Sequence, residues 1–508
     1  MEYALLLVFV LPILSVPFVY FTGKKSSKAA ALIVALIALI NIGLVLSAAL
    51  TISPSNPRYI EEYDWIPVLN NTNFTLFVDG ISASIAIISL ILILAAALFS
   101  VNYMEGKKNL PVYYALLSLL SVGLVGVFIT SNLLLFYFCW ELMLVPAYFI
   151  VGGWGYRESY RAAFKLFIFT HAGAVFVLLG IGAIYMFTGT TDMFAAQSAL
   201  TSIAPDLVKW ILIALTAGFM VKMAIVPVHM WLPDAHSEAP ATMSALLSGV
   251  IISAGAYAII RLSFGVVFPA VDVAFGTIFL HALSVFGVIS AFFGSLIALV
   301  ETDIKRIIAY SSIAHMGYVM FGISLIPATL AGNGTLALAA AVAVSGTVLH
   351  LLSHAVSKGL LFLSAGGVMH QTEVRDVNDM GGLAGKMPFT AVSSTMASLS
   401  IAGAPPFACF FSEFLIFVGA FEIINVDGFY LLPTVFMLIA TVISLAYSLR
   451  FISKVFLGQP KVTVDTVKKL LDVPNYMKLA MGILVVFVVL LGIYPTFFLH
   501  LINTVSFG

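Results

Sequence analysis

The sequence predicts an all-α polytopic membrane protein with about 14 transmembrane helices, from its composition and its apolar runs. Hydrophobic residues make up 62% of the 508-residue chain and charged residues only 9%. A soluble globular protein carries about 25% charged residues, so most of this surface is expected to face lipid. The apolar runs are long and continuous, and they lack the alternating pattern of barrel strands. Helices are therefore the expected spanning elements.

The apolar runs give fourteen expected spans, and two of these contain helix breakers. The spans are 3–22, 29–52, 77–103, 111–131, 133–153, 162–188, 207–226 with a broken continuation to about 247, 249–268, 273–299, 306–326, 336–369, 388–421, 430–453 and 477–502. Prolines at 227, 233 and 240 break the seventh span, and the segment Gly403-Ala404-Pro405-Pro406 interrupts the twelfth.

The two broken spans occupy corresponding positions if spans 4–8 and 9–13 form two five-helix repeats. Five is an odd number, so the second repeat is expected to be inverted in the membrane. Interrupted helices at corresponding positions of two repeats indicate a transport site. No long linker separates the parts, and we expect a single membrane domain over 1–508. Its parts are N-terminal helices (1–110), a first repeat (111–268), a second repeat (273–453), and a C-terminal loop and helix (454–508).

The loop charges predict the orientation of the chain. Eighteen of the 23 lysine and arginine residues fall at alternate loops, whereas the opposite loops hold only Arg58 and Lys209. The positive-inside rule then places both termini on the outer side of a cell membrane or another energy-transducing membrane. The segment from Ser53 to Phe74 is the only sizeable outer loop expected. The first apolar run lacks a basic leader region, so we expect it to remain as a helix.

The chain offers few ligands for a redox group. Its two cysteines, Cys139 and Cys409, fall within apolar runs, and an iron–sulfur cluster or structural zinc needs about four ligands. We therefore expect no cofactor and no metal in this chain. The sequence has no basic patch of the kind that would indicate binding of nucleic acid.

Several ionisable residues fall inside the apolar spans, where a charge costs at least ~2.5–3.5 kcal/mol. They are Glu141 in the fifth span, Lys222 in the seventh, His315 in the tenth, His350, His354 and Lys358 in the eleventh, and Glu413 in the twelfth. Steps of four residues place His350, His354 and Lys358 on nearly one helix face. Histidine and desolvated lysine both suit proton transfer. A polar stripe that joins helices is the alternative interpretation.

The remaining interpretations concern a charged pair, one arginine and three histidines. Glu141 and Lys222 are expected to be partners across two helices, acting as a switch or, alternatively, as a static pair that fixes packing. Arg261 is expected to snorkel to the outer surface. Isolated histidines at 171, 281 and 370 are expected to be structural.

Residues from about 78 to 421 resemble the antiporter-like subunits of respiratory complex I, Mrp-type sodium/proton antiporters and membrane-bound hydrogenases. The segments that carry the resemblance are VDGISAS, FCWELMLVPAY, FMVKMAIVPVHMWLPDAHSEAPATMSALLSG, DIKRIIAYSSIAHMGY, HLLSHAVSKGLLFLSAGG and FFSEF. The resemblance implies proton transfer by Glu141 and Lys222 in the half-channel where protons enter. It also implies a central relay that includes His315, His350, His354 and Lys358, and a terminal role for Glu413.

The resemblance further implies that His229, Asp234 and His236, beside the broken seventh helix, are secondary candidates for proton entry. One position departs from the family. Many relatives carry a lysine where this chain has Ser253, and a serine can hold water but carries no charge. In this interpretation, water, His315 or a different coupling ion takes the place of that lysine in connecting the two half-channels.

The preferred function is translocation of protons, or exchange of sodium for protons, in a multisubunit energy-converting complex. The expected partners are other membrane subunits, cytoplasmic redox subunits and the lipid bilayer. Two alternatives are a scaffold subunit that has lost transport and a quinone-binding redox subunit.

Overall fold

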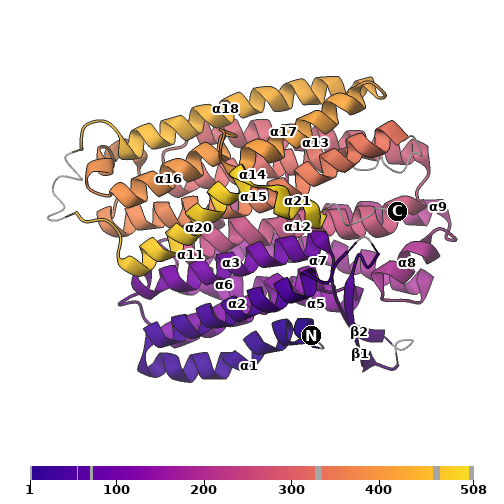
Figure 1. Ribbon diagram of the computed structural model, residues 1–508, viewed down its shortest axis with the longest axis horizontal. Coiled ribbons are helices and arrows are strands. Elements are labelled where there is room, and N and C mark those ends of the chain that lie inside the picture. Colours follow the sequence, from indigo (N-terminus) through magenta and orange to yellow (C-terminus); the bar gives the residue numbers. More distant parts are fainter. Residues whose placement is uncertain (1–2, 54, 69–71, 326–333, 462–469, 503–508) are drawn as a thin grey trace.

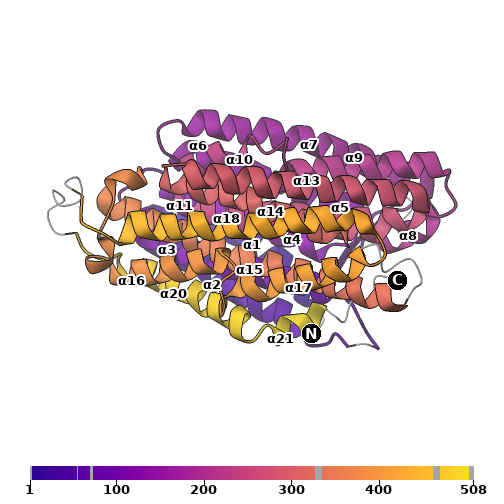
Figure 2. The same ribbon diagram turned by 90° about the horizontal axis from the view of Figure 1, so that it is seen from above.

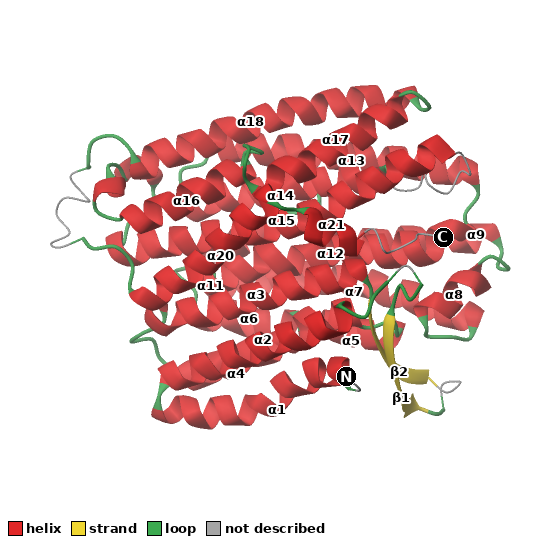
Figure 3. Ribbon diagram, viewed as in Figure 1, coloured by secondary structure: helices red, strands yellow, loops and turns green. Residues whose placement is uncertain are grey.

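The computed structural model describes residues 3–53, 55–68, 72–325, 334–461 and 470–502, except for the side chains of 334–339. Long helices lie side by side in an elongated bundle, with one small hairpin at one end (Figures 1 and 3). Among the described residues, twelve helices are long and apolar enough to cross a membrane. The two other expected spans border the helix breakers: the 19-residue helix Pro205–Met223 forms 207–226 and ends at the first break, whereas 388–421 is split into the shorter helices Pro388–Ile401 and Ala408–Ile424. The chain is thus an all-α membrane protein, as predicted.

The N-terminal part packs three helices against one another, with a hairpin at one end of them (Figure 1). Its elements are α1 (Ala4–Lys25), α2 (Ser27–Ala49), β1 (Tyr59–Ile66), β2 (Thr72–Val78) and α3 (Gly80–Tyr103). The hairpin lies largely in the segment from Ser53 to Phe74, which was expected to be an outer loop. The Glu61 carboxylate accepts hydrogen bonds from the backbone N–H groups of Leu5 and Leu6, both at 2.9 Å. The carboxylate thus satisfies free donors at the start of α1, and this anchors the hairpin to the bundle.

The first five-helix unit contains the first interruption. It comprises α4 (Leu110–Ile129), α5 (Leu133–Leu142), α6 (Leu144–Trp154), α7 (Ser159–Thr188), α8 (Met193–Leu200), α9 (Pro205–Met223), α10 (Leu232–Glu238) and one further long helix. That helix combines α11 (Ala241–Leu246), η1 (Leu247–Ile251), α12 (Ile252–Ala258), η2 (Ile259–Val267) and η3 (Phe268–Ala270). The predicted continuation of the seventh span to 247 is wrong, because the eighth span already begins at Ala241.

The second unit runs in the opposite sense and contains the second interruption. It comprises α13 (Val273–Val300), α14 (Ile304–Ser324), α15 (Gly334–Thr372), η5 (Val377–Asp379), η6 (Leu383–Gly385), α16 (Pro388–Ile401), α17 (Ala408–Ile424), η7 (Gly428–Tyr430) and α18 (Leu431–Phe456). The last described helices, α20 (Asn475–Ile493) and α21 (Thr496–Ile502), cross over the bundle (Figures 1 and 2). They divide at Pro495 a span that was expected to be continuous.

Hydrogen bonds between loops show which loops lie together at each end of the bundle. At the end where the cations gather, Arg375 O accepts from Ile304 N, and Tyr156 N donates to Glu238 O. At the other end, Asn132 donates to Thr191. Ion pairs of Arg306 with Asp234 and of Arg375 with Glu238 lie at the first of these ends.

Arg261 does not snorkel, and this expectation is wrong. Its side chain is only 7% exposed and forms a 2.6 Å ion pair with Asp79, which is 1% exposed. Asp79 also accepts a hydrogen bond from the N–H of Ser82 at the start of α3. The pair therefore joins α3 to the π-helical segment η2 inside the protein. A buried pair of this kind is costly if one partner is removed.

Candidate functional site

Lys222 lies at the end of α9, where the first interrupted helix stops. The chain turns at Ala224, which has a left-handed φ of 59°. The lysine side chain is 2% exposed. Its ammonium donates to the carbonyl of Trp140 at 2.9 Å and lies 4.0 Å above the indole ring. The helix end thus holds a buried cation against α5 through a backbone carbonyl and an aromatic face.

Glu141 follows Trp140 but bonds to a different partner from the one expected. Its carboxylate lies 3.2 Å from Nδ1 of His171 on α7, and no ion pair joins it to Lys222 within the described residues. The side chain is 23% exposed, and that of His171 is 49% exposed. The predicted direct contact between Glu141 and Lys222 is therefore absent. Lys222 instead contacts Trp140, the residue that precedes Glu141. His171, expected to be isolated, contacts Glu141.

Lys358 is fully buried on α15, in the second unit. Its ammonium donates to Ser311 Oγ and to the carbonyl of Ile308, the latter at 3.3 Å. Both partners belong to α14. The adjacent Ser312 shares a 2.9 Å hydrogen bond with Ser248, on the eighth span. Hydroxyl groups therefore lie between Lys358 and the helix that separates the two units.

One and two turns before Lys358, the histidines of α15 meet His315 of α14. His315 Nδ1 lies 3.1 Å from His350 Nε2, and His315 Nε2 lies 3.3 Å from the hydroxyl of Tyr447 on α18. His350 Nδ1 lies 2.9 Å from Ser412 Oγ on α17. Both imidazoles therefore have a hydrogen-bond partner at each ring nitrogen. Tyr447, His315, His350 and Ser412 therefore form a continuous hydrogen-bonded line across four helices.

His354 belongs to the same cluster but lacks a hydrogen-bond partner for either ring nitrogen among the described residues. Its ring centroid lies 5.8 Å from that of His315. The hydroxyl of Tyr318, which stacks on His315, is likewise unpartnered in this part of the chain. Buried polar groups normally bond to protein or to ordered water. Three ring or hydroxyl atoms of this cluster are thus left without the partner that buried polar atoms normally have.

Glu413 lies on α17, one residue after Ser412, and is 7% exposed. The carboxylate faces Gly403 in the break between α16 and α17, where a Cβ would lie 2.5 Å from Oε2. Ligand atoms of His315, His350 and Glu413 all lie within 4.8 Å of one another. Two imidazoles and a carboxylate are a donor set that zinc accepts, so these three residues could hold a metal ion.

The secondary candidates occupy three different environments around the first break. His229 is 9% exposed, and its ring lies 4.8 Å from that of Phe293. Asp234 forms ion pairs with Lys165 at 2.7 Å and with Arg306 at 2.9 Å. The aspartate therefore joins loops at the cation-rich end of the bundle.

His236 is fully buried and stacks on Phe362, with no hydrogen-bond partner for either nitrogen among the described residues. Nearby, Lys305 is also fully buried and donates to the carbonyl of Ala239. Lys305 is one of the eighteen cations expected at loops, and its burial was not expected. Lys305 lies at the start of α14, between the charged residues Asp303 and Arg306, and such a position in the sequence normally indicates exposure to water.

The eighth span lies between the two units, and Ser253 is in its middle. A Cβ at Gly249 would lie 3.1 Å from the carbonyl of Ala355 on α15, and one at Gly255 would lie 2.8 Å from the backbone nitrogen of Met223 on α9. Such close approaches require glycine on both sides. Ser253 itself donates to the carbonyl of Gly249 at 3.0 Å. The helix that separates Lys222 from Lys358 therefore carries a small hydroxyl at this position.

Comparison with known proteins supports the family resemblance. Residues 130–444 match the family model described as NADH:quinone oxidoreductase/Mrp antiporter, TM. The NADH-quinone oxidoreductase subunit M of Pseudomonas aeruginosa is 34% identical over 85% of this chain and 81% of its own length. The F(420)H(2) dehydrogenase subunit M of Methanosarcina mazei is 31% identical over 96% of this chain and 94% of its own length.

A solved structure extends this similarity to the fold. A chain of respiratory complex I from Thermus thermophilus with bound NADH superposes with a TM-score of 0.82 at 21% identity, over 98% of this chain and 99% of that chain. The similarity therefore extends beyond residues 78–421, where the sequence motifs had placed it.

Proposed function

This chain belongs to the family of NADH:quinone oxidoreductase and Mrp antiporter transmembrane subunits, and we propose that it translocates protons along its buried polar residues. It is a membrane subunit similar to subunit M of complex I-type assemblies. In the proposed path, Glu141 and Lys222 serve the first unit and Lys358, His354, His350 and His315 serve the second. Glu413 ends the path.

The hydrogen-bonded pair of His315 and His350 is the observation that carries the proposal. A neutral imidazole donates from one nitrogen and accepts at the other. A proton that arrives at one nitrogen can therefore leave from the opposite nitrogen, and the acceptor and donor roles then reverse. Tyr447 and Ser412 occupy the outer nitrogens, so the pair continues on both sides.

The burial of the cluster supports transport rather than stability. His350, His354 and Lys358 are fully buried, and buried ionisable groups are costly in a membrane. An apolar face would pack the same helices at lower cost. The line is also dominated by nitrogen donors, whereas hard cations prefer oxygen ligands. This chemistry favours protons over sodium as the ion carried through the second unit.

Orientation and partners follow from the same proposal. The cation-rich end would face the cytoplasm, which places both termini outside. Redox subunits that drive transport would then dock at the cytoplasmic side, next to other membrane subunits. Mass spectrometry of the gently purified complex identifies the partners. Iron–sulfur or nickel-site subunits would assign the chain to a redox pump, and small membrane subunits alone to a sodium/proton antiporter.

A scaffold subunit that has lost transport is the second candidate, and Ser253 favours it. The serine hydroxyl bonds within its own helix, at the position where many relatives carry a charge. The variant Glu141→Gln distinguishes the candidates, because it removes the titratable group and keeps the shape. Glu422→Gln, at an exposed position on α17, is the matched control.

The assay is acidification of sealed membrane vesicles that contain the assembled complex. If the chain carries protons, Glu141→Gln lowers acidification on the order of 10-fold or more, as loss of an acid–base group does. The control variant keeps full acidification. Unchanged acidification in Glu141→Gln, with normal assembly, would favour the scaffold.

A further inference from the structure

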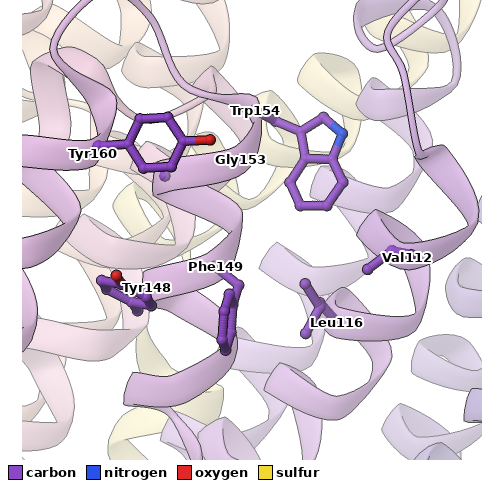
Figure 4. A pocket seen from close by; sticks show the side chains of 8 residues that line it. Val112, Leu116, Tyr148, Phe149, Gly153, Trp154 and Tyr160 are labelled. Atoms are coloured by element: carbon purple, nitrogen blue, oxygen red, sulfur yellow. The ribbon is translucent and has the colours of Figure 1, made fainter.

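We propose that this chain binds an anionic phospholipid in an apolar groove between α4, α6 and α7. The groove has a volume of about 440 Å³ and is lined mainly by apolar atoms of Val112, Leu116, Tyr148, Phe149, Trp154 and Tyr160. Its volume falls in the ~300–1,000 Å³ range of small-molecule sites. In Figure 4 the side chains of Trp154, Tyr160, Phe149 and Leu116 surround an open space. The proposal does not depend on ion transport.

The groove opens to the outer surface of the bundle, not to the polar path. Val112 is 40% exposed, Phe149 52% and Tyr160 77%. Exposed apolar surface on a membrane helix faces either lipid or another subunit. Trp154 and Tyr160 combine an apolar body with a polar tip, as aromatic residues at the lipid–water boundary do. The groove therefore suits an acyl chain that enters from the bilayer.

Four cationic residues belong to the segments that border one end of the groove. The indole of Trp154 donates to the carbonyl of Lys108 at 2.8 Å, which places Lys107 and Lys108 next to the groove. Arg157 lies three residues after Trp154, and Arg161 directly follows Tyr160. All four are exposed, and none forms a salt bridge within the described part of the chain. They outnumber the two exposed acidic neighbours, Glu105 and Glu158.

The excess of cations beside the groove favours a lipid with an anionic headgroup as its occupant. An apolar helix of a neighbouring subunit would fill the groove but would leave the four cations unpaired. Basic pockets between helices at the cation-rich side of membrane proteins bind anionic headgroups. The phosphate would lie among the cations, and an acyl chain would lie between Phe149 and Leu116.

The structure supplies a variant that fills the groove without disturbing the fold. Gly153 lines the groove, lies in helix α6 and has nothing within 4 Å of a Cβ added to it. The Cβ of Gly153→Leu therefore meets no heavy atom within 4 Å, its side chain extends from the groove lining, and leucine favours the helix over glycine. Gly43 on α2 is equally exposed and equally open, so Gly43→Leu is the matched control. The charge variant is Lys108→Gln with Arg161→Gln, and Lys25→Gln is its control.

The experiment measures phospholipid retained by the purified complex in detergent, using native mass spectrometry. Phosphatidylglycerol and phosphatidylcholine with identical acyl chains are the probes. We expect retention of phosphatidylglycerol over phosphatidylcholine, a loss of that lipid in Gly153→Leu, and about five-fold weaker binding for each removed cation. The controls should behave as the wild-type chain does.

Three outcomes would overturn the proposal. The first is equal retention of the two phospholipids by the wild-type complex. The second is retention of phosphatidylglycerol by Gly153→Leu at the wild-type level. The third concerns a photo-crosslinker placed at Phe149 in the native complex: exclusive crosslinking to a neighbouring subunit would show that protein, not lipid, fills the groove.

Discussion

Replacement of Gly403 by alanine should displace the Glu413 carboxylate. Gly403 has a left-handed φ of 66°, and a Cβ there would lie 2.5 Å from Glu413 Oε2. That distance is roughly 1 Å shorter than an unstrained contact of ~3.5 Å. The left-handed backbone costs a residue with a Cβ about 1–2 kcal/mol, and movement of the carboxylate adds to this. The movement needed is about 1 Å, which can cost ~10²-fold in activity at a site where geometry matters.

The matched control separates the two effects. Gly106 has a φ of 79° and nothing within 4 Å of a Cβ, so Gly106→Ala introduces backbone strain without a new contact. Chemical denaturation of the purified complex measures stability, and vesicle acidification measures transport. We expect Gly403→Ala to lose more of both than Gly106→Ala.

A double-mutant cycle isolates the contact itself. In a Glu413→Ala background the carboxylate is gone, so Gly403→Ala should cost only the backbone part, as at Gly106. The reasoning is refuted if Gly403→Ala keeps wild-type transport, or if its stability cost is the same with and without the carboxylate.

Three further predictions concern ion pairs and a helix cap away from the proposed proton path. Arg261→Met leaves Asp79 buried without a partner and should cost about 3–5 kcal/mol in denaturation, whereas the double variant with Asp79→Asn should recover much of this; no recovery would argue against the pair. The Lys209 ammonium beside Asp272 holds the pKa of that carboxyl below its usual range. The ionised carboxylate therefore stabilises the folded chain above about pH 4, and this stabilisation is lost as the pH falls further. Denaturation from pH 6 to pH 3 should show this loss in the wild-type chain, and Asp272→Asn should weaken the pH dependence. Glu61→Ala removes two acceptors at the start of α1 and should cost about 1 kcal/mol in denaturation, with an unchanged midpoint counting against the cap.

The spans could be predicted from the sequence because the bilayer imposes a length and a composition on each helix. The broken helices could be predicted as well, because prolines at 227, 233 and 240 and the segment Gly403-Ala404-Pro405-Pro406 gather breakers at one place, whereas the isolated prolines Pro12 and Pro17 leave α1 continuous. The π-helical segments η1 and η2 could not, because their side-chain pattern is as apolar as that of an α-helix. The division at Met143 between α5 and α6 was also missed.

The candidate site was predictable along each helix but not between helices. The spacing of His350, His354 and Lys358 predicts one shared face, and the three are buried together. Their partners Ser412 and Tyr447 come from helices far along the chain. The sequence contains many serines and tyrosines, and nothing in it shows which of these hydroxyls lies close to the histidines. His171 was missed for the same reason.

Errors about Arg261 and Lys305 have a shared physical cause. Each lies near a helix end, where a long side chain normally reaches water. In both cases a partner from another segment, Asp79 or the carbonyl of Ala239, draws the charge inward. Sequence position alone does not reveal that partner.

The most direct test of proton translocation is the effect of Lys358→Met on proton movement by the assembled complex in sealed vesicles. Methionine keeps the length of the buried side chain but removes its titratable group, and Lys386→Met, at an exposed loop position, is the control. We predict that Lys358→Met abolishes acidification while the complex assembles normally and the control pumps at the wild-type rate. Acidification at the wild-type rate in Lys358→Met would contradict the proposed path.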